Sequence, residues 1–433
     1  MNEKIIIFGG GPCGMRLAEN FIDKGKDVHL YEKEESLGGC WKVKWENGYF
    51  KEHSPRVMTT GYEKVVELVE SLDLKDPYSE IYGSSFQSTY MFIKYFLNNL
   101  SFLDNLKFMY SLLFLTQSDE RNMKEWIDDN NLTTLGRKSL RNLSIALANI
   151  PEGVSAFCFF DFIYSGLGEG GQFMQFRQGD EWLKKWEKRL LKKGVKIHLN
   201  TKINSLYGEG DMIEYALTNK GRVYGDKFLL SIPLWSLKEI LKNSKNKNIQ
   251  DNWMKSEDFT KVCEKLSYSG LGVQLHFKKR TGIDLDENWC GTCMGDWSII
   301  VQNTSHYLEK FTKRKDIKEV WSCVIVDFTR KSKRLDKTPG KLTKEQIGEE
   351  VIYQLEKTLD KKIKPEKITY NLIEKKNGKW DFFESAYSAN TDGPIKPKGK
   401  KIKNLFTVGC QNLNEIAILD GALKSADEFT NEN

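Results

Sequence analysis

The sequence lacks an apolar run long enough to cross a membrane. The uncharged run from Phe108 to Ser118 falls well short of the roughly 20 residues that span a bilayer as a helix. A strong excess of one charge is also missing, because 66 Lys and Arg residues are balanced by 60 Asp and Glu residues in a chain of 433. The net charge of +6 is carried by scattered lysine clusters, which does not predict a nucleic-acid partner.

Regular cysteine spacing is missing as well. The eight cysteines are irregularly placed, which favours a reducing, intracellular compartment. The pair in Cys290-Gly291-Thr292-Cys293 has no second C-x-x-C and no paired histidines, so no metal is expected. Residues 1–4 lead into an apolar run with no signal peptide before it, so we expect a cytoplasmic protein. A chain of this length is expected to form two domains.

The first 32 residues contain the most informative pattern. Ile5–Phe8 predicts a buried parallel strand, Met15–Lys24 a helix, and Asp27–Tyr31 a second strand. The intervening glycines fit G-x-G-x-x-G, which allows a tight turn, close approach of a pyrophosphate and close packing of the helix. An acid at the end of the second strand can accept hydrogen bonds from a ribose diol. The pattern predicts a dinucleotide site that includes Gly9, Gly11, Cys13, Gly14 and Glu32.

A second glycine pair follows soon after the acid. Glu32-Lys33 precedes Gly38-Gly39, and residues 52–62 begin with Glu and close with Tyr. These features resemble the FAD-binding signature of the amine oxidase and carotenoid (phytoene) desaturase superfamily, and residues 52–62 most resemble the desaturase branch. Cys40 stands where many relatives have Arg or Lys, and Arg56 stands where desaturases often have His. The resemblance implies FAD as cofactor, with further binding residues at Lys33, Gly39 and Lys42.

The resemblance recurs in the middle and at the end of the chain. Residues 195–199 predict a strand before Ile203, which resembles the place where relatives bind adenine through the backbone. Residues 405–410 predict a buried strand that ends in glycine, and residues 418–426 open a helix. In the family this segment surrounds the ribityl and pyrimidine end of the flavin. The binding residues implied here are Gly409, Asp420 and Ala422.

The resemblance also implies an α/β fold with two domains. One is a Rossmann-like FAD-binding domain of the glutathione reductase-like type, built on a parallel sheet. The other is an α+β substrate domain with strand candidates at residues 271–277 and 320–327. We expect the flavin ring at their interface. The expected FAD domain is discontinuous (1–75, 168–238 and 385–433), and the expected substrate domain comprises residues 76–167 and 239–384.

The expected chemistry belongs mainly to the flavin. An FAD-dependent oxidoreductase holds a substrate C–H bond over flavin N5 for hydride transfer and excludes water. Classical amine oxidases add a lysine on the strand resembling residues 271–277, where this chain has Gly272, and an aromatic cage. Trp380 and Tyr387 are the cage candidates, and with Arg56 they are the predicted catalytic residues. The surrounding segment lacks the cysteine that some members bond to the flavin, so FAD is expected to be non-covalent.

Three functions remain open at this point. The first is a dehydrogenase or desaturase acting on an apolar small molecule, favoured by residues 52–62 and by apolar helices. The second is an amine oxidase that produces hydrogen peroxide, favoured by Trp380 and Tyr387 and weakened by Gly272. The third is a non-redox flavoprotein, such as an isomerase or a binding module. The electron acceptor is left open.

The segment 90–116 is markedly apolar, and its apolar residues recur at helical spacing. This pattern predicts helix faces that are buried in the second domain. Two alternatives are a helical hairpin over a substrate tunnel and a peripheral contact with a membrane surface, from which an apolar substrate is taken.

Overall fold

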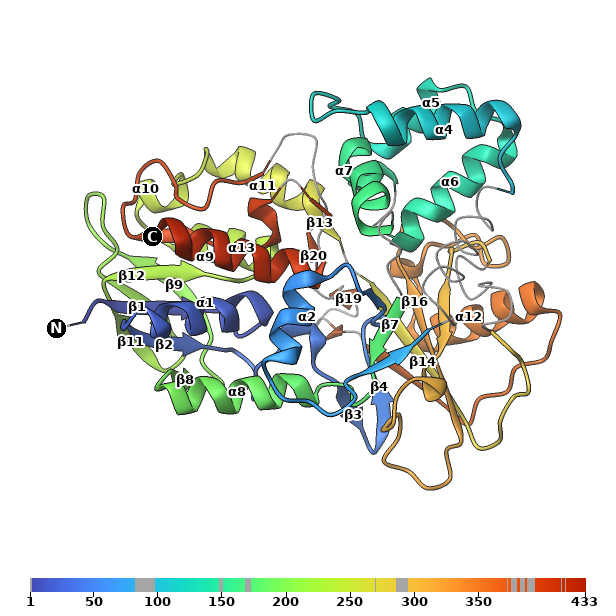
Figure 1. The fold of residues 1–433 in the computed structure, drawn as a ribbon, viewed down its shortest axis with the longest axis horizontal. Coiled ribbons are helices and arrows are strands. Elements are labelled where there is room, and N and C mark those ends of the chain that lie inside the picture. Colours follow the sequence, from blue (N-terminus) through green and yellow to red (C-terminus); the bar gives the residue numbers. More distant parts are fainter. Residues whose placement is uncertain are drawn as a thin grey trace.

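Figure 1 shows the fold of the chain in a computed structural model. The structure describes residues 2–81, 98–147, 151–167, 173–268, 270–285, 295–371, 394–413, 415–416 and 418–433, with three short strands at 373–374, 380–381 and 386–387. The Cys290–Cys293 pair lies outside these residues, as does the first part of the apolar segment, residues 90–97.

A five-stranded sheet forms one half of the molecule. Its order is β21-β12-β1-β2-β8, and every neighbouring pair is parallel. Strands far apart in sequence therefore lie side by side, which confirms the predicted parallel α/β fold. The strands are β1 (Lys4–Phe8), β2 (Asp27–Tyr31), β8 (Lys196–His198), β12 (Lys227–Leu230) and β21 (Leu405–Thr407).

The apolar run of β1 is buried because both faces of this sheet are covered. Ile5 and Ile7 pack into one core cluster and Ile6 and Phe8 into another, since side chains alternate along a strand. Figure 1 shows helices on one face and a small sheet with further helices on the other. These layers are α1 (Pro12–Asp23), α8 (Glu181–Lys193) and α13 (Leu419–Glu432) on the first face, with β9 (Ile203–Tyr207) and α9 (Leu234–Asn243) on the second.

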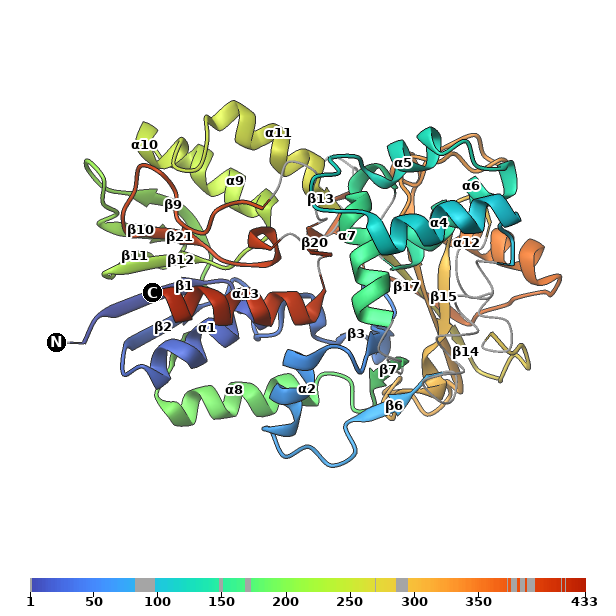
Figure 2. The same cartoon turned by 45° about the horizontal axis from the view of Figure 1, so that its top comes forward.

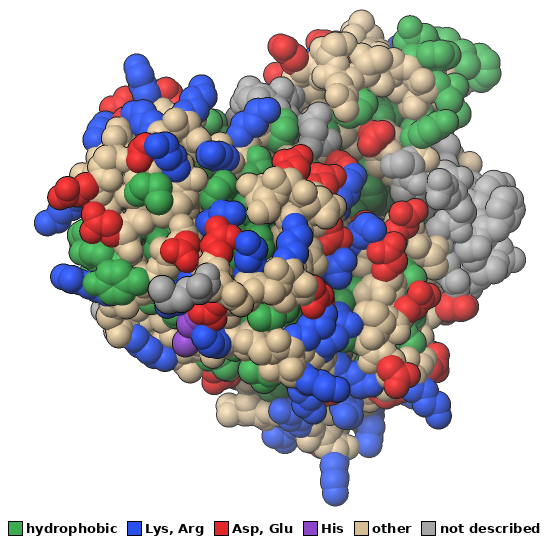
Figure 3. Space-filling view, turned by 60° about the vertical axis from the view of Figure 1, so that its left-hand side comes forward, with side chains coloured by type: hydrophobic (Ala, Val, Ile, Leu, Met, Phe, Trp, Pro, Cys, Tyr) green, Lys and Arg blue, Asp and Glu red, His purple; other side chains and the backbone are tan. Residues whose placement is uncertain are grey.

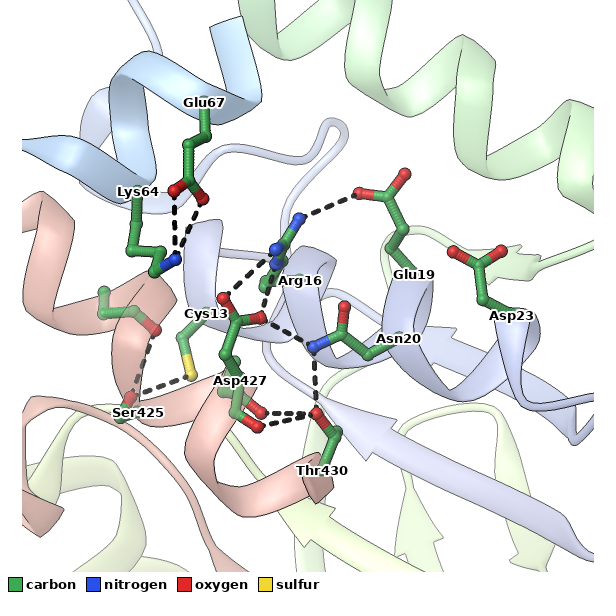
Figure 4. A network of polar contacts seen from close by, with 12 residues as sticks. Cys13, Arg16, Glu19, Asn20, Asp23, Lys64, Glu67, Ser425, Asp427 and Thr430 are labelled. Carbon is green, nitrogen blue, oxygen red and sulfur yellow. Dashed lines mark hydrogen bonds and ion pairs between the residues drawn. The ribbon is translucent and has the colours of Figure 1, made fainter. Parts of the chain in front are cut away.

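A polar network joins α1 to α13. Arg16 donates two hydrogen bonds to Asp427, at 2.6 and 3.1 Å. Asn20 donates to the same carboxylate at 2.8 Å and to Thr430 at 2.9 Å (Figure 4). The bidentate Arg16–Asp427 geometry fixes the two helices in both distance and orientation. The helix that follows the first glycine turn is thereby held against the last helix of the chain.

An antiparallel sheet forms the other half, in the order β15-β16-β14-β17. Leu271, Val273 and Leu275 point to a core shared with α12, and the alternate residues face the β3–β4 hairpin. Strand β14 has the bounds predicted from the sequence. The elements are β14 (Leu271–Phe277), β15 (Ile300–Asn303), β16 (Glu319–Ile325), β17 (Lys367–Asn371), α12 (Lys344–Leu359), β3 (Lys44–Glu46) and β4 (Tyr49–Lys51).

A group of helices lies beside the antiparallel sheet (Figure 2). Its core contains the fully buried rings of Trp126, Phe159 and Phe160. Capping boxes start two of its helices, at Ser101 and Asn122, since each side chain accepts a hydrogen bond from the third residue of the helix. The helices are α4 (Phe102–Phe114), α5 (Met123–Asp129), α6 (Thr134–Leu147) and α7 (Ala156–Asp161).

The outer face of α4 differs from the sequence prediction. Its apolar side chains were expected to be buried, but seven of them are exposed, from 42% at Met109 to 77% at Phe102. Periodicity identifies an apolar face without showing that anything covers it. These seven residues, called the α4 apolar face below, are Phe102, Leu103, Leu106, Met109, Tyr110, Leu113 and Phe114.

The remaining elements are short. Within the described part of the chain, no helix is long and apolar enough to cross a membrane. The remaining helices and strands of the described part are β5 (Met58–Thr59), α2 (Glu63–Glu70), β6 (Tyr78–Glu80), β7 (Phe173–Phe176), β10 (Tyr215–Thr218), β11 (Gly221–Tyr224), α10 (Lys247–Gln250), α11 (Ser256–Leu266), β13 (Ser267–Tyr268), β18 (Ile373–Glu374), β19 (Trp380–Asp381) and β20 (Ala386–Tyr387).

Candidate functional site

A cavity of about 740 Å³ lies at the carboxyl ends of the parallel strands and reaches the antiparallel sheet. Open α/β sheets bind their ligands at this edge. Of the cofactor-binding residues predicted from the sequence, Gly14 and Asp420 do not line this cavity. The predicted residues that do line it are Gly9, Gly11, Cys13, Glu32, Lys33, Gly39, Lys42, Arg56, Ile203, Gly409 and Ala422.

The turn after β1 needs its glycines. Gly9 has φ of +108°, and a Cβ there would collide with the carbonyl oxygen of Ser231. A Cβ on Gly14 would collide with the carbonyl oxygen of Gly9, so Gly14 serves the packing of helix on strand. Gly11 caps α1, and the start of this helix faces the cavity. Backbone N–H groups at a helix start stabilise a phosphate.

Glu32 lies at the end of β2 with its side chain almost buried. One carboxylate oxygen accepts the N–H of Gly10 at 2.6 Å, and the other accepts the N–H of Glu34 at 2.9 Å. A carboxylate has about four acceptor positions, so this one can still accept hydrogen bonds from a ribose diol. Ile203 lines the same end of the cavity.

The second glycine pair packs against the first glycine turn. Gly38 and Gly39 have φ of +113° and +55°, and a Cβ on Gly39 would come within 3.1 Å of Gly11 Cα. The segments around Gly9–Gly11 and Gly38–Gly39 thus pack backbone against backbone, and we call this surface the glycine cradle. The Lys42 ammonium group donates to the Ser36 carbonyl at 3.3 Å, which holds a positive charge at the wall.

The C-terminal segment closes the cavity. Gly409, Cys410, Leu419 and Ala422 line it. Asp420 points away, because its carboxylate accepts the N–H of Val65 at 3.0 Å and so ties α13 to α2. Burial raises the pKa of Asp420.

The sequence profile of the flavin-containing amine oxidoreductase family matches residues 12–428, nearly the whole chain. The chain belongs to this family. It is an FAD-dependent oxidoreductase. The glycine cradle and the buried Glu32 carboxylate fit the diphosphate and ribose of FAD.

Solved structures with the same fold include several oxidases. A protein assigned as a protoporphyrinogen oxidase, from Exiguobacterium sp. 255-15, has a TM-score of 0.66 at 16% identity, over 100% of this chain and 98% of that chain. Cyclohexylamine oxidase from Brevibacterium oxydans IH-35A has a TM-score of 0.65 at 12% identity, over 100% and 99%. Putrescine oxidase bound to putrescine has a TM-score of 0.61 at 12% identity, over 100% and 99%. A comparison with curated proteins returned no match.

Among the described residues, three cysteines line this cavity, called the FAD cavity below: Cys13, Cys40 and Cys410. Burial raises the pKa of each thiol, to about 11 for Cys13. A protonated thiol is a poor nucleophile. The lining thiols therefore do not favour a covalent bond to the flavin, which agrees with the expected non-covalent cofactor.

The end of the cavity beneath the antiparallel sheet is apolar. Ile145, Val324 and Val326 form a small buried cluster there, with Ile300 packed against them. The structure describes the backbone of Trp380 and Tyr387, in β19 and β20, and their side chains lie outside the described part. The apolar lining residues are Val57, Ile145, Ala146, Leu147, Gly270, Ile300, Val324 and Val326.

Gly272 has no space for a side chain. A Cβ there would collide with the carbonyl oxygen of Glu52. The lysine that amine oxidases of this family carry on this strand therefore has no counterpart at residue 272. Among the described lining residues, the lysines come from elsewhere in the chain, at Lys33, Lys42, Lys44 and Lys202.

Arg56 lines the FAD cavity, but its guanidinium is already engaged. It donates to the carbonyl oxygen of Trp41 and, at 2.7 Å, to that of Lys42. Sequence reasoning missed several lining residues, which lie in the loop after β4, just after β12 and on α9. Examples are His53, Ser54, Ser231, Trp235, Glu239 and Asn243.

Proposed function

We propose that this FAD-dependent oxidoreductase is a dehydrogenase or desaturase that acts on an apolar small molecule. The observation that carries the proposal is the apolar end of the FAD cavity, built from Ile145, Ile300, Val324 and Val326. When bound, FAD accepts a hydride from a substrate C–H bond at flavin N5. The apolar walls would bind the substrate by burying its surface and would keep water out of the site.

Amine oxidation with release of hydrogen peroxide is the second candidate. The family and two of its structural neighbours, cyclohexylamine oxidase and putrescine oxidase, favour it. Trp380 and Tyr387 stay predictions as an aromatic wall of the substrate site. Gly272 argues against this candidate, because no lysine side chain can project from that position. Anaerobic reduction of the bound flavin by a polyene or by an amine separates the two.

We also propose that the α4 apolar face contacts a membrane surface. The two charged residues of α4 turn away from this face. Lys107 donates to the Asn130 carbonyl at 2.6 Å, and buried Asp104 accepts from the Thr133 hydroxyl at 2.6 Å. Figure 3 shows apolar side chains gathered at the outer edge of the helical group, at the upper right. The same group of helices contributes Ile145 to the cavity.

Replacing Leu106 and Leu113 together with glutamate should release the protein from lipid vesicles. Each leucine buried in lipid contributes about 1.5–3 kcal/mol, so we expect at least a roughly tenfold loss of the bound fraction. Co-sedimentation with neutral phosphatidylcholine vesicles measures it. Leu191→Glu is the matched control, because this leucine is 53% exposed on α8, outside the α4 apolar face.

Two results would contradict the membrane contact. If the wild-type protein does not sediment with vesicles, the proposed membrane contact is wrong. Sedimentation equilibrium that shows a dimer lost in the double variant would mean that a second copy of the chain covers the α4 apolar face instead.

A further inference from the structure

A buried acid lies directly behind the FAD cavity. Glu52 follows β4 and is 2% exposed, and neither of its carboxylate oxygens has a hydrogen-bond partner of ordinary geometry among the described residues. Its ion-pair partner is Arg56, whose Nε lies 3.5 Å from Oε2. Removing one member of such a buried pair leaves an uncompensated charge in the interior.

Arg56 connects this acid to the cavity wall. Its two terminal nitrogens donate to the carbonyl oxygens of Trp41 and Lys42, in the segment that begins with the second glycine pair. Arg56, Trp41 and Lys42 all line the cavity. Arg56 therefore lies between the Glu52 carboxylate and the cavity, and the charge of Glu52 partly cancels the charge of the guanidinium at the cavity wall.

Polar side chains of the antiparallel sheet lie near Glu52. Gln274 donates to the Glu52 carbonyl at 2.8 Å, and in the sheet register it lies opposite Ser322, which lies opposite Gln302. Burial raises the pKa of Glu52 to about 7, against the opposing influence of Arg56 and Ser322. His53 interacts electrostatically with Arg56 and with Lys44 on β3, and His276 lies on β14. The packed strands also carry Glu46 on β3, Tyr49 and Lys51 on β4, and Glu319 on β16.

We propose that Glu52 is a positioning residue that acts through Arg56: ionised Glu52 neutralises the guanidinium at the cavity wall and so lowers the reduction potential of the bound FAD. Reduction adds negative charge to the flavin, which an uncompensated cation at the wall stabilises. The proposal concerns the cofactor and does not depend on which substrate is oxidised. Its test needs no substrate, so its failure is distinct from that of the proposed function.

The experiment measures the midpoint potential of the FAD-loaded protein against a reference dye near pH 8. We expect Glu52→Gln to shift the oxidised–reduced equilibrium at least tenfold toward reduced FAD, which is about 30 mV for a two-electron couple. Arg56→Gln removes both the guanidinium and the charge that lowers the pKa of Glu52, so Glu52 becomes neutral and the potential should stay close to that of wild type, as should that of the double variant. Near pH 6, where wild-type Glu52 is largely protonated, the effect of Glu52→Gln should shrink.

Glu319→Gln is the matched control. Glu319 is 3% exposed in the same sheet, but its carboxylate accepts from Thr281 N–H at 2.9 Å and does not line the cavity. It should lower the melting temperature without moving the potential. A wild-type potential in Glu52→Gln, or an equal shift in Glu319→Gln, overturns the proposal.

Glu52→Asp keeps the test decisive if Glu52→Gln does not hold FAD. This variant retains the negative charge and should keep a potential close to that of wild type. A shift in Glu52→Asp toward reduced FAD by tenfold or more would show that the charge is not the cause and would also overturn the proposal.

Discussion

Replacing Glu32 with alanine is expected to weaken FAD binding roughly thirty- to hundredfold. The carboxylate is the acid at the end of β2, and its oxygens are fixed by the N–H groups of Gly10 and Glu34. Alanine would remove the charge-assisted hydrogen bonds to the ribose, which contribute on the order of 2–3 kcal/mol. It would also leave two N–H groups without their acceptor, so the protein without FAD should melt at a lower temperature.

Titration of the protein with FAD after removal of the cofactor measures this loss. Glu34→Ala is the control, because Glu34 also lines the cavity but contributes its backbone N–H to the carboxylate, and alanine keeps that group. We expect a change of less than about threefold in Glu34→Ala. An unchanged FAD affinity in Glu32→Ala would remove Glu32 from the ribose site.

Ile300→Asp is expected to lower kcat/KM about a hundredfold while FAD stays bound. Ile300 is half-buried at the start of β15 and lines the apolar end of the cavity. Binding an apolar substrate against the new carboxylate would desolvate that carboxylate, which costs about 2–3 kcal/mol of binding free energy. The glycine cradle lies elsewhere in the cavity, so the FAD-to-protein ratio should not change.

Ile352→Asp separates a loss of substrate binding from a loss of stability. Ile352 is also half-buried and packs against the core beneath the same sheet, but it lies outside the cavity. Melting temperature, FAD content and kcat/KM are measured together. If both variants lose activity in proportion to their melting temperatures, the apolar end is not the substrate site. A higher kcat/KM for an amine in Ile300→Asp than in wild type would favour amine oxidation.

The first turn of the fold could be predicted closely because its signals are local. β2 has the predicted bounds, and α1 begins at Pro12, three residues before the predicted helix. Gly9 and Gly14 are needed for steric reasons that involve Gly9 itself and Ser231, which directly follows β12. The buried strand expected over residues 405–410 is β21, which ends at Thr407, and its place at the edge of the sheet was not predicted. The division into two discontinuous domains stays a prediction.

The parts that depend on long-range packing could not be predicted. Asp420 matches the family pattern, but its carboxylate is taken by Val65, more than 350 residues away in sequence. Arg56 stays a predicted catalytic residue, but the contacts of its guanidinium with two carbonyl oxygens and Glu52 carry no signal in the sequence. The α4 apolar face has the period of a buried helix, and only the packed structure shows that its outer side is exposed.

Anaerobic mixing of the FAD-loaded protein with candidate substrates tests the central claim most directly. An acyclic polyene and a primary amine of matched length are each added without oxygen, and the visible absorbance of the flavin is followed. Because the cavity ends in Ile145, Val324 and Val326, and because Gly272 leaves no space for a lysine side chain on β14, we predict that the polyene bleaches the flavin and the amine does not. Bleaching by the amine alone, with hydrogen peroxide formed when oxygen is admitted, would contradict the account.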